Sequence, residues 1–258
     1  MIQSFPTITK IKNFFIEIGD ITYFSNRFFK ELFSKPFEFK EFLRQCYNMG
    51  NKSLGLVLIT GFIIGLVLTL QTRPTLEQFG AEAWMPSMVS ISLIREISPI
   101  ITALICAGRI GSGIGAELGS MRVTEQIDAM EVSGTNPFKY LVVTRVLATT
   151  LMVPILVIFG DVMGLYGSYL VENLKGDVSF FLYFNKVFNA IEFSDLIPAT
   201  IKTFFFGYAI GIVGCYKGYY CEKGTVGVGI AANSAVVYTS MLLFIIDFIA
   251  VFVTDIFI

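Results

Sequence analysis

The chain has 258 residues, of which 54% are hydrophobic and only 15% are charged, and its formal net charge is −1 at pH 7. Together with a mean hydropathy of +0.70, this composition excludes an ordinary soluble domain, in which about 25% of the residues are charged. The chain has no histidine, and its four cysteines lack CxxC spacing. These absences argue against a zinc site, a haem site, a catalytic triad and a histidine proton relay, and we expect no metal site and no catalytic residue.

Residues 1–51 precede the first long apolar run and predict amphipathic helices that lie in the membrane interface. This segment lacks the continuous apolar core and small-residue cleavage site of a signal peptide. Residues 8–47 indicate two amphipathic pieces with a break near Pro36. The apolar positions at helical spacing are Ile8, Ile11, Phe15 and Ile18, followed by Phe24, Phe28, Leu32 and Phe33.

Five uncharged or nearly uncharged runs predict five transmembrane helices, because about 20 apolar residues cross the hydrocarbon core as a helix. The first run lies between Lys52 and Arg73. The others run from Ala83 to Gly108 with Arg95 and Glu96, from Val146 to Val171 with Asp161, roughly from Leu196 to Tyr216 with Lys202, and roughly from Val226 to Ile256 with Asp247 and Asp255. The predicted fold is therefore an all-α integral membrane protein, one domain over residues 1–258, with the bundle in residues 52–258.

The distribution of lysine and arginine predicts the orientation, because cytoplasmic flanks carry the excess of these residues. The segment up to the first span holds eight of the 19. Placing that segment inside leaves only Arg73, Lys175 and Lys186 outside. We therefore expect a cytoplasmic N-terminus and a C-terminus on the outer side.

A ladder of small residues occupies the inner end of the second span. Ala107, Gly111, Gly115 and Gly119 are four residues apart, so on a helix they form one stripe roughly 18 Å long. Such stripes let membrane helices approach closely, and helix packing is the favoured interpretation. The stretch "GRIGSGIG" lacks the GxxxxGK[ST] pattern and follows no strand, which excludes a nucleotide-binding loop.

A short charged segment follows the ladder. Ser120 or Thr124 is a suitable N-cap, Glu125 and Asp128 fall in the first turns, and Gly134 is a stop signal. The segment predicts a short amphipathic helix in an inside loop between the second and third spans. It is either a solvated loop helix or a docking surface for a cytoplasmic partner, and the spacing does not decide between these two.

Arg95 and Glu96 lie in the middle of the second span, where an ionisable residue costs at least about 2.5 to 3.5 kcal/mol on insertion scales. Such residues normally face a cavity or a partner. Pro99 frees backbone groups and bends the helix, which favours a cavity here. Two interpretations stay open: internal salt bridges that hold the bundle together, or a pairing with an anionic ligand.

Three further ionisable residues lie within the spans and are weaker candidates for a functional site: Asp161, Lys202 and Asp247. Of these, Lys202 is predicted to extend its amine toward the interface. If Glu96, Asp161 and Asp247 relay cations, the chain is an ion-coupled carrier. A membrane scaffold that only anchors its partners is a third hypothesis.

Two stretches closely resemble the permeases of the MlaE/YrbE type, the membrane subunits of ABC transporters that move lipids between membranes. They are "LIREISPIITALICAGRIGSGIGAELGSMRVTEQIDAMEVSGTNPFKYLVVTRVLA" and "CYKGYYCEKGTVGVGIAANSAVVYTSMLLFIID". The resemblance extends over nearly the whole chain. Two departures are mild: "EIS" at residues 96–98, where Leu and Gly are usual, and an N-terminal segment rich in Phe.

The resemblance implies a permease in the bacterial inner membrane that has no enzymatic activity of its own. It implies a homodimer with a lipid cavity between the copies, open to the outer side, where an MCE-domain protein docks. A separate cytoplasmic ATPase, which binds ATP and Mg²⁺, would supply the energy, and a STAS-domain protein often joins it. No cofactor in this chain and no nucleic-acid partner are expected.

The resemblance also implies roles for individual residues. Arg95 and Glu96 match the family's charged pair near the lipid pocket, and Gln71 matches a polar position beside that pocket. "MRVTEQIDAMEV" matches the helix that couples the permease to the ATPase. Its coupling residues would be Arg122, Thr124, Glu125, Gln126, Ile127, Asp128, Met130 and Glu131.

Overall fold

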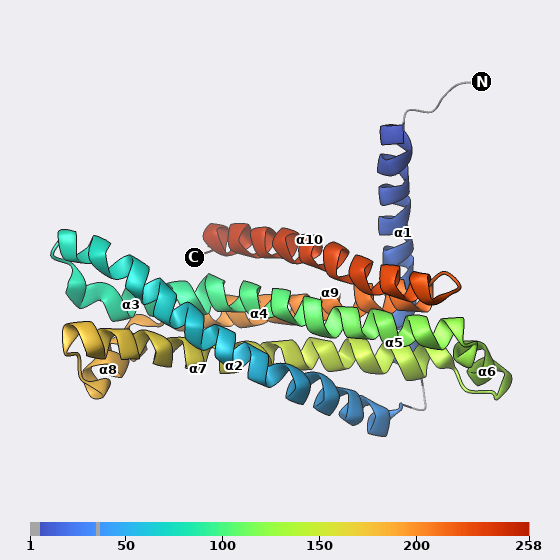
Figure 1. Ribbon diagram of the computed structural model, residues 1–258, viewed down its shortest axis with the longest axis horizontal. Coiled ribbons are helices and arrows are strands. Elements are labelled where there is room, and N and C mark those ends of the chain that lie inside the picture. Colours follow the sequence, from blue (N-terminus) through green and yellow to red (C-terminus); the bar gives the residue numbers. More distant parts are fainter. Residues whose placement is uncertain (1–5, 35–36, 258) are drawn as a thin grey trace.

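The computed structural model of the chain describes residues 6–34 and 37–257, and nearly all of these residues are helical. Figure 1 shows an elongated bundle with α6 at one end and α3 and α8 at the other. These ends are called the α6 end and the α8 end below. In chain order the helices are α1 (Pro6–Leu32), α2 (Phe39–Gln78), η1 (Glu82–Trp84), α3 (Met85–Ser92), η2 (Leu93–Ile97), α4 (Ser98–Cys106), η3 (Ala107–Gly111), α5 (Ser112–Val123), α6 (Gln126–Val132), η4 (Phe138–Val143), α7 (Thr144–Gly176), α8 (Phe180–Ala190), α9 (Phe193–Tyr219) and α10 (Thr225–Phe257).

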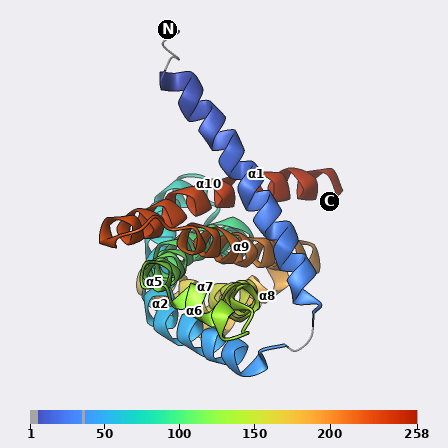
Figure 2. The same cartoon turned by 90° about the vertical axis from the view of Figure 1, so that its right-hand side faces the viewer.

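Five helical segments are long and apolar enough to cross a membrane, which confirms the predicted all-α membrane fold. They are Phe39–Gln78, Glu82–Val123, Phe138–Gly176, Phe193–Tyr219 and Thr225–Ile256. Each contains one of the predicted apolar runs. The first four extend beyond their runs, because the flanking polar and charged residues continue the helices, whereas the fifth adds only Thr225. Figure 2 shows them nearly end-on, with α10 on the outside of the bundle over α9.

The N-terminal segment forms one helix and part of a second. The predicted break near Pro36 falls on residues 35 and 36, outside the described residues, and α1 ends at Leu32 before it. The second piece is not separate: α2 begins at Phe39 and continues into the first span, because no proline interrupts it before Pro74. The predicted limit between residues 51 and 52 therefore lies inside α2. Figures 1 and 2 show α1 crossing the α6 end of the bundle.

Two phenylalanines of α1 hold this helix on the bundle. Phe24 and Phe28 are only 1% and 2% exposed. The Phe24 ring packs edge-on against Phe138 at 4.9 Å between centroids. Phe33, which shares the predicted apolar face, is exposed instead. The side chains of Ile8, Ile11 and Phe15 lie outside the part of the chain that the structure describes.

Glycines bring α2 and α7 into backbone contact. A Cβ atom added at Gly61 would lie 2.6 Å from the carbonyl oxygen of Gly160, and one added at Gly65 would overlap the carbonyl oxygen of Gly164. The two pairs are each four residues apart, the spacing that lets membrane helices approach closely. Neither pair was predicted, although "GFIIG" and "GDVMG" have the same four-residue spacing of small residues as the ladder from Ala107.

Three π-helical turns interrupt the spans, at η2, η3 and η4. The turn η2 contains Arg95 and Glu96 and ends two residues before Pro99. Proline has no N–H to donate to the preceding turn, so the helix widens there, in agreement with the predicted irregularity. Single π turns of this kind frequently mark functional sites.

A buried arginine clamps α2 to α7 at the α8 end. Arg73 is 8% exposed. It donates to Glu172 of α7 at 2.9 Å and to the backbone carbonyl of Lys175 at 3.1 Å. Arg73 is predicted to lie just after the first span on the outer side, but α2 extends past it to Gln78 and buries it against α7.

Candidate functional site

The small-residue ladder packs against α9 and α10 of the same chain. Ala107, Gly111, Gly115 and Gly119 are all buried. A Cβ at Gly111 would meet Ile210 of α9 at 3.6 Å, and one at Gly115 would meet the backbone of α10 at 3.3 Å. The ladder therefore joins the helix that leads to α6 with the two last spans.

The charged segment after the ladder differs from its predicted form. The helix α5 continues to Val123, so Met121 to Val123 belong to the second span and not to a separate helix. Thr124 ends α5 and does not begin the next helix. Glu125 precedes α6 in a left-handed conformation with φ of 59°. This single residue turns the chain, and α6 then runs over only seven residues, Gln126–Val132.

The predicted coupling residues divide into an exposed and a packed set. Ile127 is fully buried and anchors α6 to the bundle, so its side chain cannot contact a partner. Met130 is half-buried beside it, and Arg122 donates to Asp128. The exposed residues are Thr124, Glu125, Gln126, Asp128 and Glu131. They form a polar surface at the α6 end, called the α6 surface below.

Arg95 and Glu96 both pair with α9. Arg95 lies 3.5 Å from Asp195, and Glu96 lies 2.6 Å from the amine of Lys202. The same amine lies 2.9 Å from Asp247 of α10. Lys202 is only 4% exposed, so the prediction that it extends toward the interface is wrong. Two carboxylates hold the amine inside the bundle, which connects the second, fourth and fifth spans.

Two adjoining clefts open beside this network. A small polar cleft contains Arg95, Glu96, Asp195 and Lys202. An apolar groove of about 540 Å³ continues from it between α9 and α10. Its lining is Pro198, Ile201, Lys202, Phe205, Ile246, Ile249, Ala250, Val253 and Thr254. The arrangement can hold a molecule with a charged or polar group at one end and a hydrocarbon chain at the other.

Two other candidate residues lie apart from these clefts. Gln71 is exposed on α2 and lines neither cleft, so one chain does not bring it together with Arg95 and Glu96. Asp161 lies on α7, and its Oδ1 atom is buried with no hydrogen-bond partner among the described residues. Within residues 6–34 and 37–257, no three His, Cys, Asp or Glu side chains meet in a way that could hold a metal ion.

Cys221, between α9 and α10, is expected to react slowly with maleimides at neutral pH. Burial and the nearby Glu222 carboxylate raise the pKa of its thiol. The thiolate is the reactive form, so the labelling rate should rise about tenfold per pH unit between pH 7 and 8. In a Cys46→Ser variant, Cys221 is the accessible thiol, since Cys106 and Cys215 are buried. Rapid labelling at pH 7 with no increase at pH 8 would contradict this expectation.

Comparisons with known proteins assign the family. The family described as "Permease MlaE" matches residues 42–253. A Rickettsia felis protein named "Probable ABC transporter permease protein" is 39% identical over 232 residues, which is 90% of each chain. A Synechocystis relative with the same kind of name is 36% identical over 206 residues, 80% of this chain and 78% of its own. "Protein TRIGALACTOSYLDIACYLGLYCEROL 1, chloroplastic" of Arabidopsis thaliana is 34% identical over 207 residues, 80% of this chain and 59% of its own. The chain belongs to the MlaE family of ABC transporter permeases.

Proposed function

We propose that this permease moves phospholipids or related lipids between membranes. The apolar groove of about 540 Å³ beside the buried amine of Lys202 carries the proposal. Hydrocarbon chains gain roughly 0.8 kcal/mol for each buried CH₂ group, so an apolar lining favours acyl chains over ions or sugars. Arg95 and Asp195 at the polar cleft would contact the headgroup. The Arabidopsis relative is named for a galactolipid, which supports a lipid substrate.

The family assignment supports partners for this transport. We propose a homodimer, in which the cavity between the copies brings the exposed Gln71 of α2 near a lipid site. We also propose a separate ATPase that binds ATP and Mg²⁺ and contacts the α6 surface, alone or with a STAS-domain protein. The α6 end would then face the cytoplasm of a bacterium, with the chain in the inner membrane.

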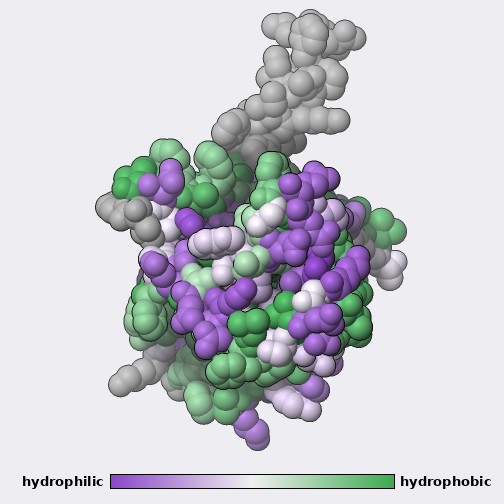
Figure 3. Space-filling view, turned by 90° about the vertical axis from the view of Figure 1, so that its left-hand side faces the viewer, coloured by the Kyte–Doolittle hydropathy of each residue, from purple (hydrophilic) through white to green (hydrophobic). Residues whose placement is uncertain are grey.

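An MCE-domain protein is proposed to dock at the opposite end. Figure 3 shows the α8 end, where hydrophilic side chains gather across the middle of the surface and hydrophobic ones lie around them. A polar end surrounded by apolar flanks suits a water-soluble partner that meets the bundle at the membrane surface.

Filling the groove tests the lipid proposal. Ala250→Trp places an indole among the groove residues, and ATP-dependent transfer of labelled phospholipid between vesicles should fall about tenfold or more. The assay uses the permease reconstituted with its ATPase. Phe248→Trp is the matched control, because Phe248 lies on the same helix, is 71% exposed and does not line the groove. Unchanged transfer by the Ala250→Trp protein would refute the proposed lipid path.

The ladder is proposed to transmit motion from the α6 surface to the groove as a rigid unit. Gly115→Leu would force α5 away from α10, and we expect lipid transfer to be lost or uncoupled from ATP hydrolysis. Gly108→Leu is the control, because a side chain at Gly108 meets nothing within 4 Å. Equal lipid transfer per ATP in both variants would contradict rigid transmission.

Asp161 favours a second hypothesis, in which the chain is an ion-coupled carrier. Its Oδ1 atom has no hydrogen-bond partner among the described residues, and Asp161 lines a small cavity together with Thr200 and Thr203 of α9, where a cation or proton could bind. Transport driven by an ion gradient in the permease without any ATPase would support this hypothesis, and transport that requires ATP would exclude it.

A further inference from the structure

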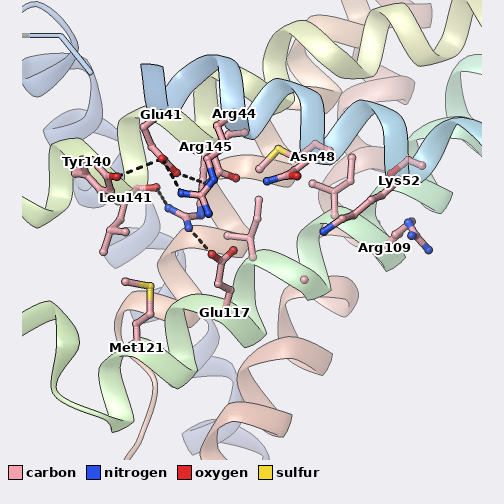
Figure 4. A pocket seen from close by; sticks show the side chains of 16 residues that line it. Glu41, Arg44, Asn48, Lys52, Arg109, Glu117, Met121, Tyr140, Leu141 and Arg145 are labelled. Carbon is pink, nitrogen blue, oxygen red and sulfur yellow. Dashed lines mark hydrogen bonds and ion pairs between the residues drawn. The ribbon is translucent and has the colours of Figure 1, made fainter. Parts of the chain in front are cut away.

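A further pocket, polar and of about 630 Å³, lies at the α6 end, between α2, the η3–α5 segment and the start of η4 and α7 (Figure 4). None of its lining residues belongs to the clefts beside Lys202. Its charged residues are Glu41, Arg44, Lys52, Arg109, Glu117 and Arg145. Neither the proposed lipid site beside Lys202 nor the proposed ATPase contact at the α6 surface involves this pocket.

The pocket has more positive than negative charge. Four cationic side chains face two carboxylates, and each carboxylate already has a cationic partner. Glu117 lies 2.8 Å from Arg145, and Glu41 lies 3.3 Å from Arg44. Lys52 and Arg109 form no ion pair with any carboxylate in the part of the chain that the structure describes. Figure 4 shows no dashed line from Lys52 or Arg109 to any other residue drawn. An excess of two positive charges therefore has no counterion within residues 6–34 and 37–257.

Two buried polar atoms of lining residues also lack a hydrogen-bond partner among the residues that the structure describes. Arg145 is 2% exposed; its Nη atoms donate to Glu117 and to the Leu141 carbonyl, but its Nε has no acceptor. Ser53 is 1% exposed, and its hydroxyl has no partner either. An unsatisfied buried donor costs about 1 to 3 kcal/mol, and a bound group that accepts hydrogen bonds would remove this cost. The missing group is an acceptor that carries negative charge.

The position of the pocket indicates which kind of molecule supplies that acceptor. Lys52 directly precedes the uncharged run of the first span, and Arg109 lies at the inner end of the second, so both are at headgroup depth. Met49, Ile110 and Ile114 give the same pocket an apolar side. Phosphate oxygens accept several charge-assisted hydrogen bonds from arginine and lysine. Basic pockets between transmembrane helices bind anionic lipid headgroups for this reason.

We propose that this pocket binds the phosphate of an anionic phospholipid headgroup from the leaflet at the α6 end. The lipid is a resident of the pocket and distinct from the transported molecule. Its phosphate would bind Lys52 of α2 and Arg109 of η3, the two cations of the lining that form no ion pair among the described residues, and so bridge the first and second spans near the α6 end. The proposal does not depend on the nature of the transported substrate.

The test is lipid binding to the delipidated, purified permease, followed by native mass spectrometry. Phosphatidylglycerol or phosphatidylcholine is added back in detergent. We expect the Lys52→Gln, Arg109→Gln double variant to bind phosphatidylglycerol about tenfold more weakly than the original chain, with phosphatidylcholine binding unchanged. Both residues are exposed and unpaired, so the fold should persist. Lys223→Gln, an exposed lysine at the same end outside the pocket, should bind both lipids normally.

Three results would overturn the proposal. Equal retention of phosphatidylglycerol by the double variant would show that the pocket does not hold it. Tight binding of inorganic phosphate that displaces the lipid would identify a free phosphate as the ligand. Unchanged lipid binding together with loss of the copurifying ATPase would assign the pocket to protein docking. The Ala250→Trp protein should keep this lipid, so a failure of the transport proposal remains distinguishable.

Discussion

Replacement of Lys202 by methionine is expected to destabilise the whole bundle. The lysine side chain is 4% exposed and is the shared partner of Glu96 and Asp247. Breaking a fully buried ion pair by removal of one partner costs about 3 to 5 kcal/mol. The cost here should lie near the lower end of this range, because the Glu96 and Asp247 side chains are 37% and 20% exposed. For a chain of this size the melting temperature in detergent should fall by at least about 5 °C. Thermal unfolding of the purified permease measures this shift.

A compensated variant separates this effect from lost packing. When Glu96→Gln and Asp247→Asn accompany Lys202→Met, no charge remains unpaired, and most of the stability should return. Lys223→Met is the control for loss of one lysine, because Lys223 is exposed. If Lys202→Met and Lys223→Met melt at the same temperature, the network contributes no stability, and ligand binding alone would have to explain it.

The five spans could be predicted from the sequence because each depends on local composition. In a membrane, a run of about 20 apolar residues forms a helix, because a helix satisfies its own backbone hydrogen bonds. This holds whichever helices pack against it. Pro99 likewise disturbs its own helix, and the π turn η2 lies directly before it. Features of this kind need no knowledge of which helices are adjacent.

The ion pairs could not be predicted in the same way. The contact between Lys202 and Glu96 joins residues separated by 106 positions, and only the packing of α9 on the second span brings them together. For a lysine without a known ion-pair partner, extension of the amine toward the interface is the expected conformation, because it keeps the charge in contact with water. Arg73 is a similar case, because its partner Glu172 lies 99 residues away on α7.

The position of α6 depended on a single backbone conformation. Thr124 and Ser120 are both good N-caps, so the sequence favours a helix start at either one. The structure instead continues α5 to Val123 and turns at Glu125, a residue that rarely adopts positive φ. The burial of Ile127 fixes the short helix to the bundle and stabilises this turn. The start of α6 therefore depends on tertiary packing, because local helix propensity allows more than one starting residue.

Replacement of Gly65 by alanine is expected to prevent normal assembly of α2 with α7. The added methyl group would overlap the carbonyl oxygen of Gly164, and backbone atoms of a packed helix cannot rotate aside as a side chain can. The two helices must separate along most of their contact, at a cost of about 3 kcal/mol or more. We expect little monodisperse protein on size-exclusion chromatography in detergent, and a lower melting temperature for the part that folds.

Gly55→Ala on the same helix is the matched control. A Cβ atom at Gly55 meets nothing within 4 Å, so the substitution adds no clash. Alanine is about 1 kcal/mol more favourable than glycine inside a helix, and the variant should be as stable as the original chain or slightly more so. Normal yield and melting for Gly65→Ala would mean that α2 and α7 are farther apart than their glycines indicate. A loss confined to Gly65→Ala would instead show that close backbone contact, and not helix propensity, makes these glycines necessary.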